Sequence, residues 1–225
     1  MSSRPIKKRT KAIANPWANA LKHLKRDAVL RRLIAQVGPC TLRRRPNYFL
    51  KLVQSILSQQ VSVQAAATMY KRLAANFPRK TITPDRLVSF LTKSDEATIR
   101  ACGLSRQKRG YLLDLATHFA SKKINTRNFS RMTDDQIVAA LLPIKGIGRW
   151  TVEMLLIFGM NRTDVWPVDD LGLQEGLRQH FGLATRPKPK EIVNFGDAWR
   201  PWRSIATWYL WRAERPKYRP VIPAL

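Results

Sequence analysis

Two adjacent carboxylates, Asp169 and Asp170, stand out in a chain in which 41 Lys and Arg residues outnumber 15 Asp and Glu residues. They follow Trp166 and precede a run in which Leu173 and Leu177 recur at helical spacing, so they lie at the predicted start of a helix. An ionised carboxylate can stabilise positive charge or accept a proton in a reaction. An aspartate at a helix start also caps free N–H groups and complements the helix dipole. Both interpretations stay open here, and capping is the commoner role.

The stretch KGIGRW, residues 145–150, is a second candidate site because its two glycines interrupt a helical pattern. A turn through Gly146, Ile147 and Gly148 would join two helices, and glycine tolerates positive φ and leaves the backbone open to close approach. The N–H groups of such a turn can contact a phosphate oxygen, with Lys145 and Arg149 adding positive charge on either side. The stretch predicts a phosphate contact that positions a duplex without reading its sequence. An ordinary turn with glycine caps is the alternative.

The overall charge indicates the class of partner. A formal charge of +26 and a sequence pI near 11.2 cause self-repulsion unless a polyanion neutralises them. Nucleic acid is therefore the expected partner, and the alternative is a generally basic protein, such as a ribosome-associated or heat-adapted one. With 44% hydrophobic and 9% aromatic residues in 225, the chain has a globular composition and can bury a sizeable core.

Other sequence features exclude several classes of site. Cys40 and Cys102 cannot supply a Cys/His zinc spacing or a four-cysteine iron–sulfur ligand set, and we expect both thiols to be buried and reduced. The basic start MSSRPIKKRTK precedes no hydrophobic region, and no long apolar span exists, so we expect an intracellular protein, in the bacterial cytoplasm or the eukaryotic nucleus. Residues 1–14 are predicted to form a disordered basic arm that binds phosphate, acts as a nuclear address or is merely solvated.

The elements that position these residues are predicted to be helices throughout. Thr83 is a predicted N-cap with Pro84 at the first helical position, and Thr133 and Gln136 form a predicted capping box. No period-two alternation flanked by turn residues is found, so the fold class is all-α. Short polar or Gly/Pro breaks divide roughly ten helices, without a linker long enough to separate domains. We therefore expect a single domain over residues 15–225.

Three stretches together are more specific than any one of them. These are ILSQQVSVQAA, LPIKGIGRWTVEMLLIFGMNRTDVWPVDDLGLQEGL and WRPWRSIATWYLWR. They resemble the helix-hairpin-helix DNA glycosylase superfamily, specifically its alkyladenine branch of the 3-methyladenine DNA glycosylase II type, over residues 20 to 213. The resemblance implies a two-lobed helical fold with the active-site cleft between the lobes, one lobe covering about 46–140 and the other built from the N-terminal and C-terminal helices.

The resemblance also implies an activity. Such a protein binds double-stranded DNA containing alkylated bases, rotates the base into the cleft and hydrolyses its N-glycosidic bond, with no cofactor and as a monomer. A purine alkylated on N3 or N7 already carries positive charge and leaves without an acid, so one carboxylate suffices. The matching position is Asp170, which would stabilise an oxocarbenium-like sugar or align water, and Asp169 becomes the neighbouring cap or supporting acid.

Further roles follow from the resemblance, position by position. Related enzymes with lyase activity carry a lysine where this chain has Trp150, so a monofunctional enzyme is implied. Lys145 is then a phosphate contact, and no metal is expected, although the hairpin carbonyls could hold a monovalent cation. Trp211 matches the family position whose ring faces the flipped base, Trp150 is the second candidate for the base pocket, and Met154 replaces an aromatic residue of the family. Core packing is expected for the remaining tryptophans of the C-terminal region, Trp199, Trp202 and Trp208.

The segment ILSQQVSV matches the loop that fills the space left by the flipped nucleotide. By position Gln60 is the wedge and Gln59 its partner at the opposing strand, because an amide can replace lost base-edge hydrogen bonds. A polar helix end is the alternative for both.

Two other functions are alternatives to the favoured glycosylase. A non-catalytic, structure-specific DNA-binding protein is disfavoured by Asp170, and a glycosylase/lyase for oxidised bases is disfavoured by Trp150 and by the missing cluster cysteines.

Overall fold

The structure, a computed structural model, describes residues 15–214, and the predicted basic arm of residues 1–14 lies outside this range. Within the described range the chain is helical and has no strands, which confirms the predicted all-α class. In that same range no helix is long and apolar enough to cross a membrane.

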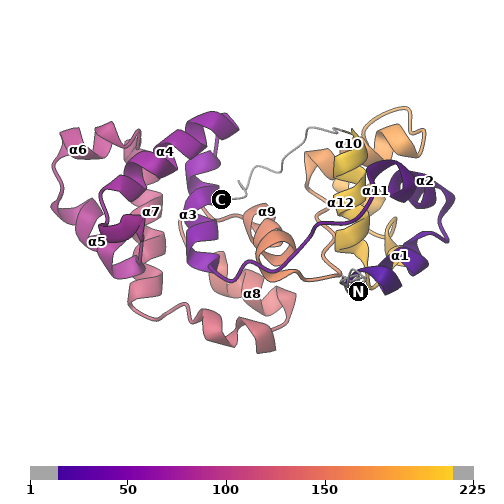
Figure 1. The fold of residues 1–225 in the computed structure, drawn as a ribbon, viewed down its shortest axis with the longest axis horizontal. Coiled ribbons are helices and arrows are strands. Elements are labelled where there is room, and N and C mark those ends of the chain that lie inside the picture. The colour runs from indigo at the N-terminus through magenta and orange to yellow at the C-terminus, as the bar shows by residue number, and fades with distance from the viewer. Residues whose placement is uncertain (1–14, 215–225) are drawn as a thin grey trace, which may run out of the picture.

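One group of helices forms the left half of Figure 1, with α3 at its centre. α3 packs on α4 and α7, and α7 packs on α5. All but one of the residues of α3 are buried, so this helix is the core of the lobe. The bounds are α3 Tyr48–Ser58, α4 Val63–Ala75, η1 Pro78–Lys80, α5 Pro84–Lys93, α6 Glu96–Ala101, α7 Arg106–Ala120, η2 Thr126–Arg131 and α8 Asp134–Leu141.

A second group, on the right of Figure 1, joins the first helices of the chain to the last ones. α12 packs on both α2 and α10, so elements at opposite ends of the sequence share one core. The predicted two-lobed architecture is therefore confirmed, whereas the lobe limits of about 46 and 140 stay a prediction. The bounds are α1 Ala18–Leu24, α2 Ala28–Val37, α10 Leu171–His180, α11 Pro189–Ile192, η4 Asp197–Trp199 and α12 Arg203–Glu214.

α9 and the element after it lie between these two groups (Figure 1). α9, Arg149–Met154, packs on α8 and continues without a break into η3, Leu155–Met160, which has the wider π-helical hydrogen-bond pattern and packs on α3. η3 ends at Asn161, which adopts the left-handed conformation with φ of 63°. Single π-helical turns are frequent at functional sites, and this one follows directly after the helix that carries Trp150.

The capping hydrogen bonds expected at two predicted helix starts are present in the structure. The Thr133 hydroxyl accepts the Gln136 N–H at 3.2 Å, and the Gln136 side chain accepts the Thr133 N–H at 2.9 Å, which completes the capping box. Thr83 caps α5, with Pro84 at its first position. These local predictions are confirmed, and each rests on residues no more than three positions apart in the sequence.

Candidate active site

Asp170 is the N-cap of α10 and is almost fully buried. Its Oδ1 atom accepts the Leu173 N–H at 2.6 Å, and the residue is 6% exposed. Asp169, its neighbour, is exposed, and its side chain accepts no hydrogen bond from the described part of the chain. Asp170, and not Asp169, therefore caps α10: the expected cap at Asp169 is wrong, and the alternative role of Asp169 as a supporting acid stays a prediction.

Two indole rings also hold the Asp170 carboxylate. Trp211 Nε1–H donates to Oδ1 and Trp150 Nε1–H donates to Oδ2, both at 2.7 Å. With the Leu173 N–H, three donors converge on a group that has about four lone-pair directions. One acceptor direction therefore stays available on Oδ2. Asp170 is thus a helix cap that keeps one free acceptor direction, and its catalytic role stays a prediction.

The loop that delivers Asp170 is fastened to α12. Arg203 Nε donates to Asp164 Oδ1 at 2.7 Å, and its Nη2 donates to the Asp164 carbonyl at 2.9 Å. The Ser204 hydroxyl accepts the Val165 N–H at 2.9 Å. At the far end of the loop the Gln174 side chain donates to the Val168 carbonyl at 2.8 Å. A charge-assisted pair and three contacts to the loop backbone therefore fix both ends of this loop.

Of the three residues predicted to line the base pocket, only Trp150 is partly exposed. Trp211 is 3% exposed, and its ring stacks on Phe158 with centroids 5.5 Å apart. Gly172 lies so close to Trp211 that a methyl group there would approach the indole Cδ1 to 3.0 Å. Met154 is also buried. The structure brings Trp150 and Trp211 together on Asp170, and their contacts with a base stay predictions.

A cavity of about 630 Å³ opens beside Trp150. The indole of Trp150 is its aromatic wall, and the other lining residues come from the end of α3 and the loop that follows. They are Ser55, Ser58, Gln59, Gln60, Val61 and Ser62. The two glutamines are predicted from the sequence but the serines are not, although Ser55, Ser58 and Ser62 recur at intervals of three and four around the same motif.

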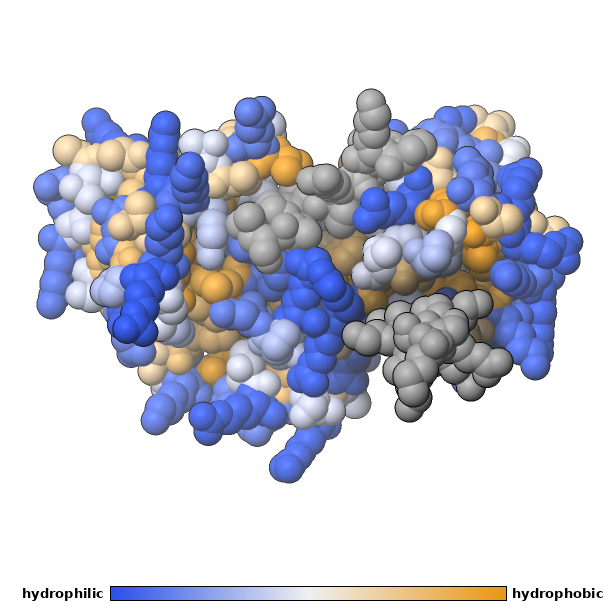
Figure 2. All heavy atoms as spheres, viewed as in Figure 1, coloured by the Kyte–Doolittle hydropathy of each residue, from blue (hydrophilic) through white to orange (hydrophobic). Residues whose placement is uncertain are grey.

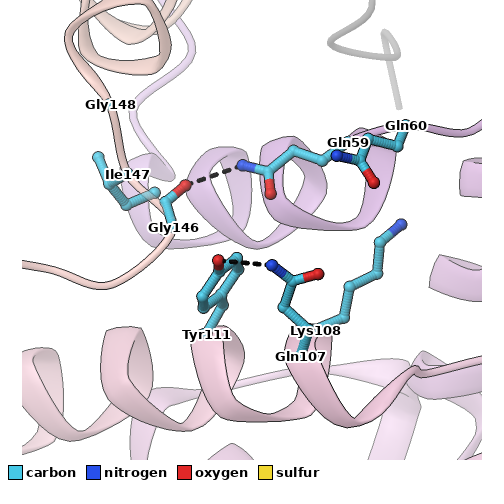
Figure 3. A pocket seen from close by; sticks show the side chains of 8 residues that line it. All are labelled: Gln59, Gln60, Gln107, Lys108, Tyr111, Gly146, Ile147 and Gly148. Carbon is cyan, nitrogen blue, oxygen red and sulfur yellow. Dashed lines mark hydrogen bonds between the residues drawn. The ribbon is translucent and has the colours of Figure 1, made fainter.

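The predicted wedge residue has an unusual backbone. Gln60 is exposed and has φ of 58°, in the left-handed region that non-glycine residues rarely occupy. Such a conformation costs energy and is found preferentially at functional sites. Gln59, in contrast, donates through Nε2 to the Gly146 carbonyl at 2.8 Å (Figure 3). Gln59 therefore links this loop to the hairpin, and its predicted contact with the opposing strand stays a prediction.

The hairpin of residues 145–149 shows its two glycines in different roles. Gly146 has φ of 81°, and a methyl group on it would overlap the Tyr111 ring, which lies directly below it in Figure 3. Gly148 has φ of −95°, is the N-cap of α9 and has open space where a side chain would be. Gly146 is required by the fold, whereas Gly148 leaves the start of α9 open to a ligand.

Side chains from α7 support the hairpin from beneath. Asp114 Oδ2 accepts the Lys145 N–H at 2.8 Å, which orients this peptide while leaving the lysine side chain exposed. Ile147 is buried and anchors the turn in the core, and Arg149 is exposed. Sequence reasoning missed Tyr111 and Asp114 because they lie more than 30 residues before the turn. The predicted phosphate contacts and hairpin cation stay predictions, and the Gly146 carbonyl already accepts one hydrogen bond.

A smaller cavity, of about 360 Å³, lies between the hairpin, the Gln59–Gln60 loop and the first turn of α7 (Figure 3). Lys108 crosses this region, and its Nζ donates to the Leu57 carbonyl at 2.6 Å. Burial lowers the pKa of the Lys108 amine. Hydrophilic side chains are spread over both ends of the face drawn in Figure 2, consistent with a charge of +26.

Glu153 is the charged residue of this region that the sequence analysis did not recognise. It lies on α9, three residues after Trp150, and is 7% exposed. Burial, opposed by the positive charge of Arg149 and aided by the negative charges of Asp169 and Asp170, raises the pKa of its carboxyl to about 7. The signal in the sequence is its helical spacing from Trp150, but that spacing alone does not show which face is buried.

A family model described as "HhH-GPD superfamily base excision DNA repair protein" matches residues 53–201. "DNA-3-methyladenine glycosylase 1" of Schizosaccharomyces pombe is 33% identical over 198 residues, which are 84% of this chain and 83% of that protein. The "Alkylbase DNA glycosidase-like protein mag2" of the same yeast is 30% identical over 206 residues, 87% of this chain and 93% of that protein. The structure of the S. pombe 3-methyladenine DNA glycosylase Mag1 in complex with abasic DNA is similar, with a TM-score of 0.77 and 32% identity, covering 90% of this chain and all of that one.

Proposed function

The chain belongs to the HhH-GPD superfamily of base excision DNA repair proteins, and on this premise we propose that it is a monofunctional DNA glycosylase that releases alkylated purines such as 3-methyladenine from duplex DNA. The relatives at 30% and 33% identity carry names of this activity. The observation that carries the proposal is the buried carboxylate of Asp170, held by two indoles beside a cavity that the Trp150 ring lines.

The chemistry assigned to Asp170 is electrostatic. In an N3-alkylated purine the C1′–N bond breaks with its electron pair moving to the base, which neutralises the positive charge of the base and leaves positive charge on the sugar. The free acceptor direction on Oδ2 faces this charge or a water molecule that adds to C1′ and loses its proton to the carboxylate or to solvent. The three fixed donors hold the carboxylate in place, so it needs no reorganisation during the reaction.

Recognition of the base is assigned to the cavity beside Trp150. A cationic purine gains from stacking on an indole, a contact worth roughly 1–2 kcal/mol. Ser55 and Ser58 line the same cavity, and the Ser58 hydroxyl, which donates to the Ser55 carbonyl, keeps acceptor capacity for the edge of a flipped base. Gln60, which also lines this cavity, is assigned the role of filling the gap that the flipped base leaves in the duplex.

Binding of the duplex is assigned to the hairpin. The start of α9 presents backbone N–H groups at Gly148, without a side chain above them, beside the exposed Lys145 and Arg149. Such a surface suits a phosphate group and does not discriminate between sequences. We assign double-stranded DNA bound by a monomer.

The absence of strand cleavage follows from the residue at the start of α9. An enzyme that cleaves the strand through a Schiff base needs an amine near C1′. Trp150 stands at that position, and its indole N–H is engaged with Asp170. Borohydride added during turnover should therefore trap no covalent complex of protein and DNA.

Release of free base from methylated duplex DNA, measured by chromatography, tests the function directly. The proposed enzyme releases methylated purines and leaves abasic, unbroken strands. A protein that binds the duplex but releases no base at any pH would be a structure-specific binding module, and a robust borohydride-trapped species would indicate a lyase. Sedimentation of the protein with a single-lesion duplex would show one protein per duplex if the monomer assignment holds.

A further inference from the structure

Glu153 shares a helix face with Trp150, one of the two tryptophans that hold the Asp170 carboxylate. Trp150 and Glu153 are three residues apart on α9, so their side chains leave the helix on the same side. The Trp150 indole donates to Asp170, which places this side of α9 against the Asp169–Asp170 pair. Glu153 is 7% exposed, and its buried carboxyl interacts electrostatically with Asp169 and with the proposed catalytic carboxylate of Asp170.

The Glu153 carboxyl is not fully satisfied by hydrogen bonds from the described residues. Its Oε2 atom is buried and has no hydrogen-bond partner among the described residues. The charged groups that face it are Arg149, one turn earlier on α9, and the two carboxylates of Asp169 and Asp170. A buried acid without a partner destabilises a fold, and such groups gather at functional sites. Glu153, Asp169 and Asp170 are called the acid cluster below.

We propose that Glu153 is a positioning residue that sets the electric charge of the acid cluster, so that its ionisation strengthens the stabilisation of the sugar cation by Asp170. The proposal rests on the glycosylase function and adds a second ionisable group to it. Glu153 acts through the field at Asp170 and is not assigned any contact with the base or the sugar.

The direction in which base release depends on pH follows from the protonation of the Glu153 carboxyl. Burial raises the pKa of Glu153 to about 7, so the group is neutral in mildly acidic solution and ionised in mildly alkaline solution. Positive charge that develops on the sugar is stabilised more strongly by two negative charges in a buried site than by one. Base release should therefore speed up as the pH rises through about 7.

The test is the rate of base release under single-turnover conditions, measured from pH 5.5 to 8.5 on a duplex with one N3-alkylated purine. Each rate is divided by spontaneous release from the same duplex at the same pH, which removes the pH dependence of the lesion itself. The full-length protein should gain about three- to tenfold across this interval, on the order of 0.7–1.4 kcal/mol. Glu153→Gln, which keeps size and removes the ionisation, should give a flat profile at the lower level.

Two matched variants shift the midpoint of the profile without removing it. Asp169→Asn takes away a negative charge that faces Glu153, so the midpoint should move to lower pH. Arg149→Gln takes away the positive charge that favours ionisation, so the midpoint should move to higher pH. These opposite shifts keep the proposal testable if Glu153→Gln folds poorly, because both variants retain Glu153.

The outcomes separate this inference from the function on which it rests. If the parent protein releases no base at any pH, the proposed function fails. If it releases base but the profile of Glu153→Gln has the same midpoint and amplitude, the role of Glu153 is overturned while the function stands. A Glu153→Gln rate that falls by one common factor at every pH would mark Glu153 as merely structural.

Discussion

The hairpin of residues 145–149 lies next to the acid centre, which consists of Asp170, Trp150 and Trp211. The two regions differ in which atoms they present and in how deeply these are buried. The hairpin exposes backbone at Gly148, and its supporting side chains lie underneath. The acid centre is buried, and side-chain atoms make its decisive contacts. Changes at Gly148 should therefore alter binding of every duplex, whereas loss of the charge at Asp170 should slow the chemical step and spare binding of the duplex.

Of the variants considered, Asp170→Asn should have the largest effect, and this effect is on the rate of base release. Without the negative charge, base release under single-turnover conditions should drop by about a hundredfold or more, which is about 3 kcal/mol. Asparagine cannot match all three donors, because its NH₂ group would face one of the indole N–H groups. The free energy of unfolding should therefore also fall, by about 1–3 kcal/mol.

Asp169→Asn is the matched control for this loss of charge. Asp169 is exposed and accepts no hydrogen bond from the described residues, so the release rate at neutral pH should stay within about threefold of the parent. A larger loss in Asp169→Asn than in Asp170→Asn would move the catalytic role to the exposed residue.

Gly146→Ala should have the next largest effect, and this effect is on stability. The new methyl group would overlap the Tyr111 ring at a position with φ of 81°, so the unfolding free energy should drop by about 1–3 kcal/mol. Urea denaturation followed by tryptophan fluorescence measures it. Gly148→Ala is the comparison, because its methyl group meets open space at an ordinary φ. Equal losses in the two variants would show that the Tyr111 contact does not matter.

Gly148→Leu should weaken binding while sparing the fold. A bulky side chain at the start of α9 would hold a phosphate away from the N–H groups, so the Kd for damaged and undamaged duplexes should rise by roughly tenfold, about 1.4 kcal/mol. Fluorescence anisotropy at several salt concentrations measures this change. Parent-like affinity on both duplexes, in a folded variant, would remove the hairpin from the binding surface.

Gln60→Gly should have the smallest effect on stability. Relief of the left-handed conformation should raise the free energy of unfolding by about 1–2 kcal/mol, because glycine adopts positive φ without strain. The greater freedom of glycine in the unfolded chain should lower it by about 0.5–1 kcal/mol. Thermal unfolding should thus occur at an equal or slightly higher temperature, although base release should slow because the wedge is gone. A variant with unchanged release would show that Gln60 fills no space in the duplex.

The local parts of this molecule were predictable from the sequence. The capping box at Thr133 and the helix start at Asp170 depend on residues within three positions of one another, and both are present. The sequence also indicated two special glycines, but only Gly146 has a positive φ. Gly146 also packs against the Tyr111 ring, which belongs to another helix, and no local pattern reveals such a contact.

The convergence on Asp170 could be predicted only in part. The resemblance selected Trp150, Trp211 and Asp170, yet it did not show that both indoles donate to the same carboxylate from 20 and 41 residues away. The buried state of Glu153 was missed for a related reason. Helical spacing gives the side of α9 on which a residue lies, whereas burial depends on which loop covers that side.

The most direct test of the separation between hairpin and acid centre measures two quantities on one alkylated duplex. They are the Kd and the single-turnover release rate at saturating protein, for the parent, Asp170→Asn and Gly148→Leu. The structure predicts that Asp170→Asn loses about a hundredfold or more in rate with Kd held or slightly improved, and that Gly148→Leu loses about tenfold in Kd with a near-parental saturating rate. Parallel losses of rate and affinity in both variants would contradict the account.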